Sequence, residues 1–326
     1  MNRIRNYTFI VLASCLLTAL GSCKSATTKA ATEEVQTDSV DSTSTAEKLF
    51  ATDSIQFTKA SKDSTITSHI VIDYPSGDND LDIAVRKYIA QELSDLHLPG
   101  ISDEPTTQKN PKFKGSLDNQ EGGKQGDKEG NKQGDKEGTL EKGKELIDFF
   151  GNSNYQYLEN ELKEIKQYSG DAEIHMCYEA NIRKTGETAH YLIYNSNTYA
   201  FLGGAHGSAS DYSVNIDKTT GKVLKETVDT TQVKALQPIL RKGVLRYFKA
   251  QGEKDVTEKN LSDYLFIEKG IIPLPKYAPY LAKDGVHFIY QQYEIGPYAM
   301  GMVSFVVPYS DIKAFLTAEA LRLTEE

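Results

Sequence analysis

The chain alternates apolar and polar residues most regularly between residues 173 and 183. The apolar set is Ile174, Met176, Tyr178, Ala180 and Ile182, and the polar set is Glu173, His175, Glu179, Asn181 and Arg183. A period of two places the two sets on opposite faces of a β-strand. A turn at Thr185 and Gly186 would return the chain as a second strand over 190–201. A third strand over 210–216 would end in the Asp-to-Gly turn at 217–221. The three strands would form an antiparallel meander with one solvent-exposed face.

Further strands are predicted on both sides of this meander. Segments 54–60 and 65–74 alternate and are rich in β-branched residues, which is typical of strands. Toward the C-terminus the pattern predicts a strand before the Asp-Gly turn at 284–285. It then predicts strands over 286–295 and 302–307, separated by a Gly-Pro break.

Apolar residues recur at helical spacing in the first half of the chain. Between 81 and 96 this spacing predicts a helix whose first turn Asp78 or Asp80 can cap. Between 146 and 165 it predicts one broken helix or two, with the break at residues 151–152.

The second half adds another amphipathic helix over 233–247, in which Pro238 is tolerated near the start. A short helix is predicted over 260–266, and Ser310 would cap a final helix. Strands outnumber helices and pair through short turns, so we expect an α+β fold. Its antiparallel β-sheets, in meanders and hairpins, would carry amphipathic helices on one face.

The N-terminus has the pattern of a bacterial lipoprotein signal. Arg3 and Arg5 precede an uncharged, mostly apolar run of about 14 residues, which is shorter than the roughly 20 residues of a membrane-spanning helix. The run ends in Leu-Gly-Ser-Cys, so we expect residues 1–22 to be a signal peptide. Cys23 would then be the lipidated N-terminus, carrying acyl groups such as palmitate and holding the chain on a membrane. Cys15 ends a similar tetrapeptide, Leu-Ala-Ser-Cys, but cleavage there would leave too short an apolar core.

Two low-complexity stretches bound the domains that we expect. Residues 23–48 comprise the lipidated cysteine and a Ser-, Thr- and Ala-rich tether that cannot bury enough surface to order itself. A hydrophilic insertion at about 103–139 contains KQGDKEGN followed by KQGDKEGT and is also predicted to be disordered. We therefore expect an N-terminal α+β subdomain over 49–171, which contains this insertion, and a C-terminal α+β domain over 172–326.

Charge excludes one class of partner. Loss of the two arginines with the signal peptide would change the formal net charge from −9 to −11, and so acidic a chain repels nucleic acid and anionic headgroups. We expect the anchor to face the periplasm rather than the cell surface, because no acidic run directly follows Cys23.

Cysteine and histidine give little evidence of redox or metal chemistry. Cys177 would have no cysteine partner in the mature chain, so we expect a buried and inert thiol. The six histidines show no metal-binding spacing, and no cofactor is expected. His175 and His190 could face each other across their hairpin, which is a weak argument for zinc.

Two separated motifs resemble a known family. They are GGAHG with the following D-x-x-T-G-K turn, and KDGVHFIYQQYEIGPYAMG followed by FVVPYSDI. Together they resemble the domain-of-unknown-function family that forms the extracytoplasmic domain of the anti-sigma factor RsiV and the N-terminal module of the peptidoglycan deacetylase PdaC. The resemblance spans about residues 50–322 and is strongest from residue 172 onward.

The resemblance implies an α+β module of the cell envelope and, in one branch, lysozyme as a protein ligand. The anti-sigma role does not carry over, because it needs a cytoplasmic domain and a membrane span, whereas only a signal peptide is expected before Cys23. Deacetylase activity does not carry over either, because the chain shows no separate domain with the required aspartates and paired histidines.

The candidate ligand-binding residues lie in the two motifs. They are Gly203, Gly204, His206, Gly207, Asp211, Tyr293, Glu294 and Tyr298. The glycines are explained by backbone at positive φ or in close approach, which favours a structural His206 over a catalytic one. Glu294 lies between apolar residues and would be a buried partner of a lysine or arginine, or part of a surface cleft. Tyrosine suits both sugar stacking and protein interfaces, but it also fills half-buried strands.

Three functions remain open from the sequence. The first is a lipid-anchored, non-catalytic binding module that recognises peptidoglycan or an envelope protein, such as a lysozyme-like enzyme. The second is an envelope hydrolase that uses His206 with Asp211, or Glu294. The third is a scaffold or assembly lipoprotein without a small ligand.

Overall fold

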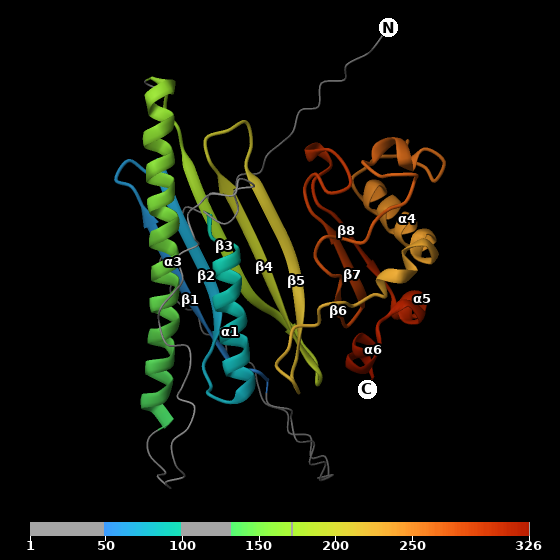
Figure 1. The fold of residues 1–326 in the computed structure, drawn as a ribbon, viewed down its shortest axis with the longest axis horizontal. Helices are drawn as coiled ribbons and strands as arrows, with labels where there is room; N and C mark the ends of the chain where they lie inside the picture. Colours follow the sequence, from blue (N-terminus) through green and yellow to red (C-terminus); the bar gives the residue numbers. More distant parts are fainter. Residues whose placement is uncertain (1–48, 99–131, 171, 326) are drawn as a thin grey trace, which may run out of the picture. The chain divides into compact units, whose positions relative to one another are not determined.

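A computed structural model describes residues 49–98, 132–170 and 172–325 (Figure 1). The predicted signal peptide, Cys23, the tether and most of the insertion lie outside these residues. The strands are β1 (Thr52–Ala60), β2 (Ile66–Pro75), β3 (Met176–Glu187), β4 (Tyr191–Phe201), β5 (Ser208–Asp217), β6 (Tyr280–Ala282), β7 (Gly285–Tyr290) and β8 (Val303–Val307). The helices are α1 (Asp80–Asp95), α3 (Lys132–Ser169), α4 (Val233–Ala250), α5 (Tyr309–Ile312) and α6 (Ala318–Thr324).

The fold is α+β, as predicted, with two antiparallel-rich sheets. The first sheet has the strand order β1-β2-β3-β4-β5 and the second has the order β6-β7-β8. The pairing of β2 with β3 is parallel, whereas the sequence pattern led us to expect antiparallel sheets throughout. The parallel pair arises because α1 and α3 lie between β2 and β3 in the chain, and a helical crossover returns the chain to the same end of the sheet.

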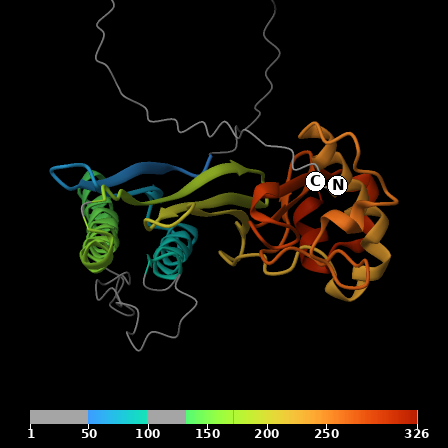
Figure 2. The same cartoon turned by 90° about the horizontal axis from the view of Figure 1, so that it is seen from above.

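Helices α1 and α3 both lie on one face of the five-stranded sheet (Figure 2). The core between them is apolar and includes Ile70, Ile72, Ile89, Leu146 and Tyr178, each at most 1% exposed. Helix α1 begins at an Asn79 capping box rather than at the expected Asp78 or Asp80.

Helix α3 differs from its prediction in two ways. It runs through Gly151 and Asn152 without a break, because a Cβ at Gly151 would meet the ring of Phe57 at 2.2 Å and the helix needs this close approach to β1. It also begins at Lys132, so the second copy of the eight-residue repeat is helical instead of disordered. Extending an established helix costs less than starting one, and the Lys, Gln and Glu residues of this copy favour the helix, whereas Gly134 and Gly138 oppose it.

Segment 224–325 forms a second core around the three-stranded sheet. Helix α4 packs on this sheet, and Gly243 lets it approach Phe305, since a Cβ there would lie 2.3 Å from that ring. Strand β7 ends at Tyr290, five residues earlier than predicted, and the chain from 291 to 297 forms turns. Ser310 does not cap a helix, because its hydroxyl donates to Asp311.

Strands from both sides of the expected boundary at residues 171–172 share one sheet. β2 pairs with β3 from Ile66↔Met176 to Ile72↔Ile182. The boundary prediction was therefore wrong in the folded region, because backbone hydrogen bonds join the segments that it separates. The only change of sheet in the described chain comes after β5.

The β3–β4 hairpin also turns later than predicted. Strand β3 continues to Glu187 through a bulge between Lys184 and Gly186, and the turn is at residues 188–190. A bulge absorbs the extra residue that the alternating pattern could not accommodate.

None of the helices in the part of the chain that the structure describes has the length and apolar character of a membrane-spanning helix.

Candidate functional site

The GGAHG segment forms the connection between β4 and β5. Gly203 has a φ of +79°, which an L side chain rarely adopts. A Cβ at Gly207 would meet the ring of Tyr199 at 2.4 Å, whereas Gly204 has no heavy atom within 4 Å of its Cβ position. Gly203 is thus required by its backbone conformation and Gly207 by the close approach of the Tyr199 ring, in agreement with the structural explanation from the sequence.

His206 contacts two tyrosines from the second motif. Its ring stacks on that of Tyr298, with centroids 3.9 Å apart and an interplanar angle of 22°. Its Nε2 is 3.2 Å from the hydroxyl of Tyr293, and its Nδ1 is 3.1 Å from the carbonyl oxygen of Gly207. We call His206, Tyr293 and Tyr298 the aromatic cluster; the fold brings these three predicted residues together from segments about 90 positions apart in the chain.

Tyr293 is the strained member of the aromatic cluster, and like His206 it is exposed. Its φ is +65°, an uncommon conformation for a bulky residue, and 55% of its surface is exposed. The hydroxyl of Tyr298 donates to Gly207 O over 3.1 Å, which fixes the loop of His206 to the loop of Tyr293. Strain retained at an exposed aromatic residue is a feature of binding and catalytic sites.

Asp211 supports the aromatic cluster without touching His206. Its carboxylate accepts a hydrogen bond from Asn195 Nδ2 over 2.6 Å. Its backbone N–H donates to Gln291 Oε1, and its carbonyl accepts from Gln291 Nε2. Gln291 therefore pairs with the edge of β5 as a neighbouring strand would, and Ala209 N donates to Gln292 Oε1 in the same way.

Glu294 is a half-buried hydrogen-bond acceptor rather than half of an ion pair. Its two carboxylate oxygens accept from the backbone N–H of Lys276 at 2.5 Å and of Gln291 at 2.6 Å. Burial raises the pKa of the Glu294 carboxyl, while these two hydrogen bonds and the charge of Lys276 oppose the rise. The predicted ion pair with a lysine or arginine side chain is thus replaced by backbone donors, and Glu294 holds the shape of the loop.

Other apolar side chains beside the aromatic cluster are also exposed. Tyr199 and Leu202, from the end of β4, are 38% and 36% exposed. Phe266 is 62% exposed, and its backbone N–H donates to Ile295 O, which places it against the loop that carries Tyr293. Clustered exposed apolar residues of this kind usually mark an interaction site.

The residues considered for metal or redox chemistry do not form a site. His175 precedes β3 and His190 lies in the turn after it, so the two are at opposite ends of that strand and cannot share a zinc ion. In the described ranges, no group of three or more His, Cys, Asp and Glu residues could hold a metal. Cys177 is half-exposed rather than fully buried, and partial burial raises the pKa of its thiol, which disfavours the reactive thiolate.

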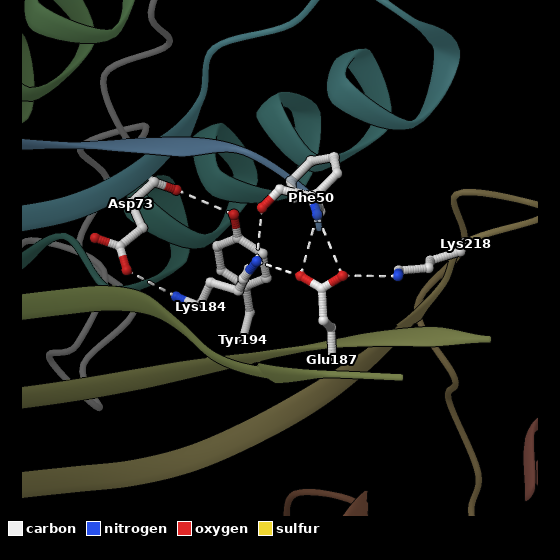
Figure 3. Close-up of polar contacts among 6 residues, drawn as sticks. All are labelled: Phe50, Asp73, Lys184, Glu187, Tyr194 and Lys218. Carbon is white, nitrogen blue, oxygen red and sulfur yellow. Dashed lines mark hydrogen bonds and ion pairs between the residues drawn. The ribbon is translucent and has the colours of Figure 1, made fainter. Parts of the chain in front are cut away.

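The structure also contains a charged cluster that the sequence did not reveal (Figure 3). Glu187, at the end of β3, accepts hydrogen bonds from Lys184 Nζ, from Lys218 Nζ at 2.8 Å and from the backbone N–H of Phe50 at 3.2 Å. Burial alone would raise the pKa of Glu187, but these bonds outweigh it and lower that pKa. The cluster fastens Phe50, the second described residue, to the β3–β4 hairpin.

This charged cluster adjoins a surface pocket. The pocket has a volume of about 360 Å³, and Phe50, Asp82 and Lys218 are among the residues that line it. Asp82 and Lys218 already have protein partners, and the pocket is wide open, so it does not resemble an enclosed ligand site.

The arrangement defines an α+β protein with a preformed, exposed aromatic surface. Residues 224–310 match a family described as "Protein of unknown function (DUF3298)". The fold is similar to that of a DUF3298 family member from Bacteroides fragilis, with a TM-score of 0.54 and 21% identity over 84% of this chain and 97% of that one. A DUF3298 protein from Pseudomonas aeruginosa PAO1 aligns with a TM-score of 0.48 and 12% identity, covering 82% of this chain and 94% of that one. No curated protein matches the chain.

Proposed function

We propose that this chain is a lipid-anchored, non-catalytic binding module of the bacterial cell envelope that recognises peptidoglycan or an envelope protein. The observation that carries the proposal is the aromatic cluster, in which Tyr293 is both exposed and conformationally strained. A flat aromatic face with a polar tip suits sugar rings and protein anchors alike. The resemblance of the two motifs to the RsiV and PdaC modules supports an envelope role.

Binding is a better explanation of His206 than hydrolysis. A general base needs a substrate-facing nitrogen and a group that orients the ring. Both ring nitrogens of His206 are within hydrogen-bond distance of a tyrosine hydroxyl or a backbone carbonyl, and one ring face is stacked on Tyr298. Asp211 and Glu294, the acids considered for a hydrolase, bond to Asn195 and to backbone N–H groups instead.

The anchor is proposed from the sequence pattern that ends at Cys23. The composition of residues 24–48 predicts a flexible tether, whose root-mean-square reach would be on the order of 25 to 30 Å. Such a tether would keep the folded part of the chain near the bilayer, and we propose that it faces the periplasm. Metabolic labelling with an alkyne fatty acid tests this. We expect the label on the wild-type chain and none on Cys23→Ala, and equal labelling of the two would exclude lipidation at Cys23.

Retention on purified peptidoglycan sacculi tests the binding function. We expect the full-length chain, in detergent, to be retained, and His206→Ala and Tyr293→Ala to reduce retention at least fivefold. Tyr168→Ala is the matched control, because Tyr168 is an exposed tyrosine at 89% on α3, outside the aromatic cluster.

A lysozyme column run in parallel separates the two ligand classes. Retention on that column alone, lost in the same variants, would identify a protein ligand. If neither material retained the wild-type chain, or if Tyr168→Ala behaved like the cluster variants, the proposal would be wrong. Release of muropeptides by wild type but not by His206→Ala would establish the hydrolase alternative.

A further inference from the structure

Helices α1 and α3 lie on one side of the five-stranded sheet (Figure 2), and most strand residues on the opposite face are polar. Strand register places its side chains in rows across the sheet. One row is Thr58, His69, Glu179, Tyr199 and Ala209, and the next is Gln56, Val71, Asn181, Asn197 and Asp211. We call the members from β2 to β4 of these two rows, without Val71, the polar strip: His69, Glu179, Tyr199, Asn181 and Asn197.

The polar strip is accessible to solvent. Glu179 and Tyr199 are exposed, and His69, Asn181 and Asn197 are half-buried. The two rows lie two residues apart along each strand, which is about 7 Å, and the span from β2 to β4 is about 10 Å. The strip is therefore a flat polar surface about as large as a few sugar rings.

The amides at the centre of the strip have no partner in the protein. Asn181 and Asn197 are directly opposite each other on β3 and β4, yet in the described chain neither side chain makes a hydrogen bond, and the carboxylate of Glu179 makes none either. Half-buried amides usually satisfy their donors and acceptors. These groups are thus available for hydrogen bonds to a ligand.

The neighbouring row of the same face behaves differently. Asp73 pairs with Arg183 over 2.9 Å. Asn195 donates to Asp211 Oδ1, to Tyr212 O and to Ser213 Oγ. Asp73, Arg183 and Asn195 therefore have partners within the protein. In the polar strip His69 has a partner in Thr58, whereas Glu179, Asn181 and Asn197 have none in the described chain.

The polar strip is continuous with the aromatic cluster. Tyr199 is the β4 member of the strip, and its ring covers the backbone of Gly207. Gly207 O in turn accepts the hydrogen bond of Tyr298. A ligand that leaves the aromatic cluster across Tyr199 would meet Asn197, Glu179 and Asn181 next.

We propose that a neutral glycan chain of N-acetylated sugars binds along the polar strip, with one end on the aromatic cluster. Acetamido groups and hydroxyls complement the free amides of Asn181 and Asn197, because both sides offer donors and acceptors. The carboxylate of Glu179 and the acidic chain disfavour anionic polymers. A protein partner is a poorer fit, since the centre of a protein interface is depleted of charge and enriched in aromatic residues. This inference rests on the proposed binding function and names its ligand class.

Calorimetric titration of the full-length chain in detergent tests the inference. The probe is hexa-N-acetylchitohexaose, called chitohexaose below, and cellohexaose is the matched ligand because it carries a hydroxyl in place of each acetamido group. We expect chitohexaose to bind at least tenfold more tightly than cellohexaose. The double variant Asn181→Ala/Asn197→Ala should weaken chitohexaose binding at least tenfold, and Glu179→Gln, a conservative change at an exposed residue, at least threefold.

The control variant is Gln156→Ala, which removes an exposed amide from α3 on the opposite side of the sheet. It should leave the Kd unchanged, and the far-UV spectrum and melting temperature of each variant show whether it has folded. The inference would be overturned if chitohexaose did not bind, if cellohexaose bound equally well, or if folded strip variants kept the wild-type Kd. The strip variants could still be retained on sacculi while Tyr293→Ala was not. In that case the assignment of the polar strip as the glycan-binding surface would be wrong, and the proposed function would stand.

Discussion

Asn215 on β5 and Leu281 on β6 form a closed pair of hydrogen bonds between the two sheets. Asn215 Nδ2 donates to Leu281 O over 2.9 Å, and the backbone N–H of Leu281 donates to Asn215 Oδ1 over 2.7 Å. Both residues are at most 1% exposed. One side chain therefore satisfies both backbone groups of a buried residue in the other sheet.

Replacing Asn215 with alanine should destabilise the fold strongly. A buried polar group that loses its partner costs about 1 to 3 kcal/mol, and two are stranded here, so we expect Asn215→Ala to lower the free energy of unfolding by about 2 to 4 kcal/mol. Urea denaturation measures this change. Asn152→Ala, which removes exposed hydrogen bonds on α3, should cost less than about 1 kcal/mol. A loss below about 0.5 kcal/mol in Asn215→Ala would contradict this account.

The three glycines of the GGAHG segment should respond differently to alanine. Gly204→Ala should change stability by less than about 0.5 kcal/mol, because its Cβ position is open. Gly203→Ala should cost about 1 to 2 kcal/mol, because of its positive φ and because Ile174 Cγ2 would lie 2.9 Å away. Gly207→Ala should displace the ring of Tyr199 and reduce retention on sacculi. Thermal melts and the retention assay together check the order, and equal behaviour of all three would show that the loop is not constrained as described.

Much of the fold could be predicted from local patterns. The alternation from Ile174 to Arg183 correctly assigned the buried and wet faces of β3, because a period of two leaves only one register that buries the apolar set. The parallel pairing of β2 with β3 could not be predicted, since it depends on where α1 and α3 return the chain. The continuous α3 was missed for a similar reason: Gly151 is explained by the ring of Phe57, a contact with another element.

The candidate site was predictable in part. GGAHG marks a constrained loop by its composition alone, and clustered tyrosines mark the second loop, so His206, Tyr293 and Tyr298 could be selected before their contacts were known. The role of Glu294 was misjudged because its partners are backbone N–H groups, which leave no trace in side-chain chemistry. Glu187 was missed because Phe50 and Lys218, which donate to it, lie 137 and 31 residues away in the sequence.

Glu187 should control the order of the segment at Phe50. Glu187→Gln removes the negative charge that faces Lys184 and Lys218, so we expect a loss of about 1 to 3 kcal/mol and faster hydrogen exchange at the Phe50 amide. The lowered pKa of Glu187 means that its contribution is present above the ordinary pKa of glutamate and is lost as the pH falls through the folded value. Exchange at Phe50 that is unchanged in the variant would refute the fastening role. Glu179→Gln, which has no such donors, is the control.

Glu92 should make the protein less stable as the pH rises. It is 8% exposed, and Tyr212, whose ring is stacked on Tyr277 at 3.7 Å, donates to its Oε1. Burial raises the pKa of Glu92, so the folded state binds the proton more tightly than the unfolded state does. The contribution of Glu92 to stability is therefore highest below the ordinary pKa of glutamate and is lost as the pH rises through the folded value.

Glu92→Gln removes this dependence while keeping an acceptor for Tyr212. We expect the variant to be more stable than wild type at pH 7.5 and the difference to shrink toward pH 4. Each unit of raised pKa corresponds to about 1.4 kcal/mol. Urea denaturation at the two pH values checks the sign, and a variant that was less stable than wild type at both would show that the carboxylate is stabilising.

His97 should have the opposite effect. Its ring is 1% exposed, its Nε2 is 2.8 Å from Ser153 Oγ, and its Nδ1 has no partner. Burial lowers the pKa of His97 to about 4, so between pH 6.5 and pH 4 the unfolded state binds a proton that the folded state does not. The contribution of His97 to stability must then fall as the pH decreases through this window. After allowance for solvent screening we expect a loss of about 2 kcal/mol that His97→Gln does not show. Ser153→Ala removes the same hydrogen bond without removing a titrating group, so its offset from wild type should be the same at pH 7 and pH 4. If the difference between wild type and His97→Gln were also constant, His97 would not be the acid-labile group.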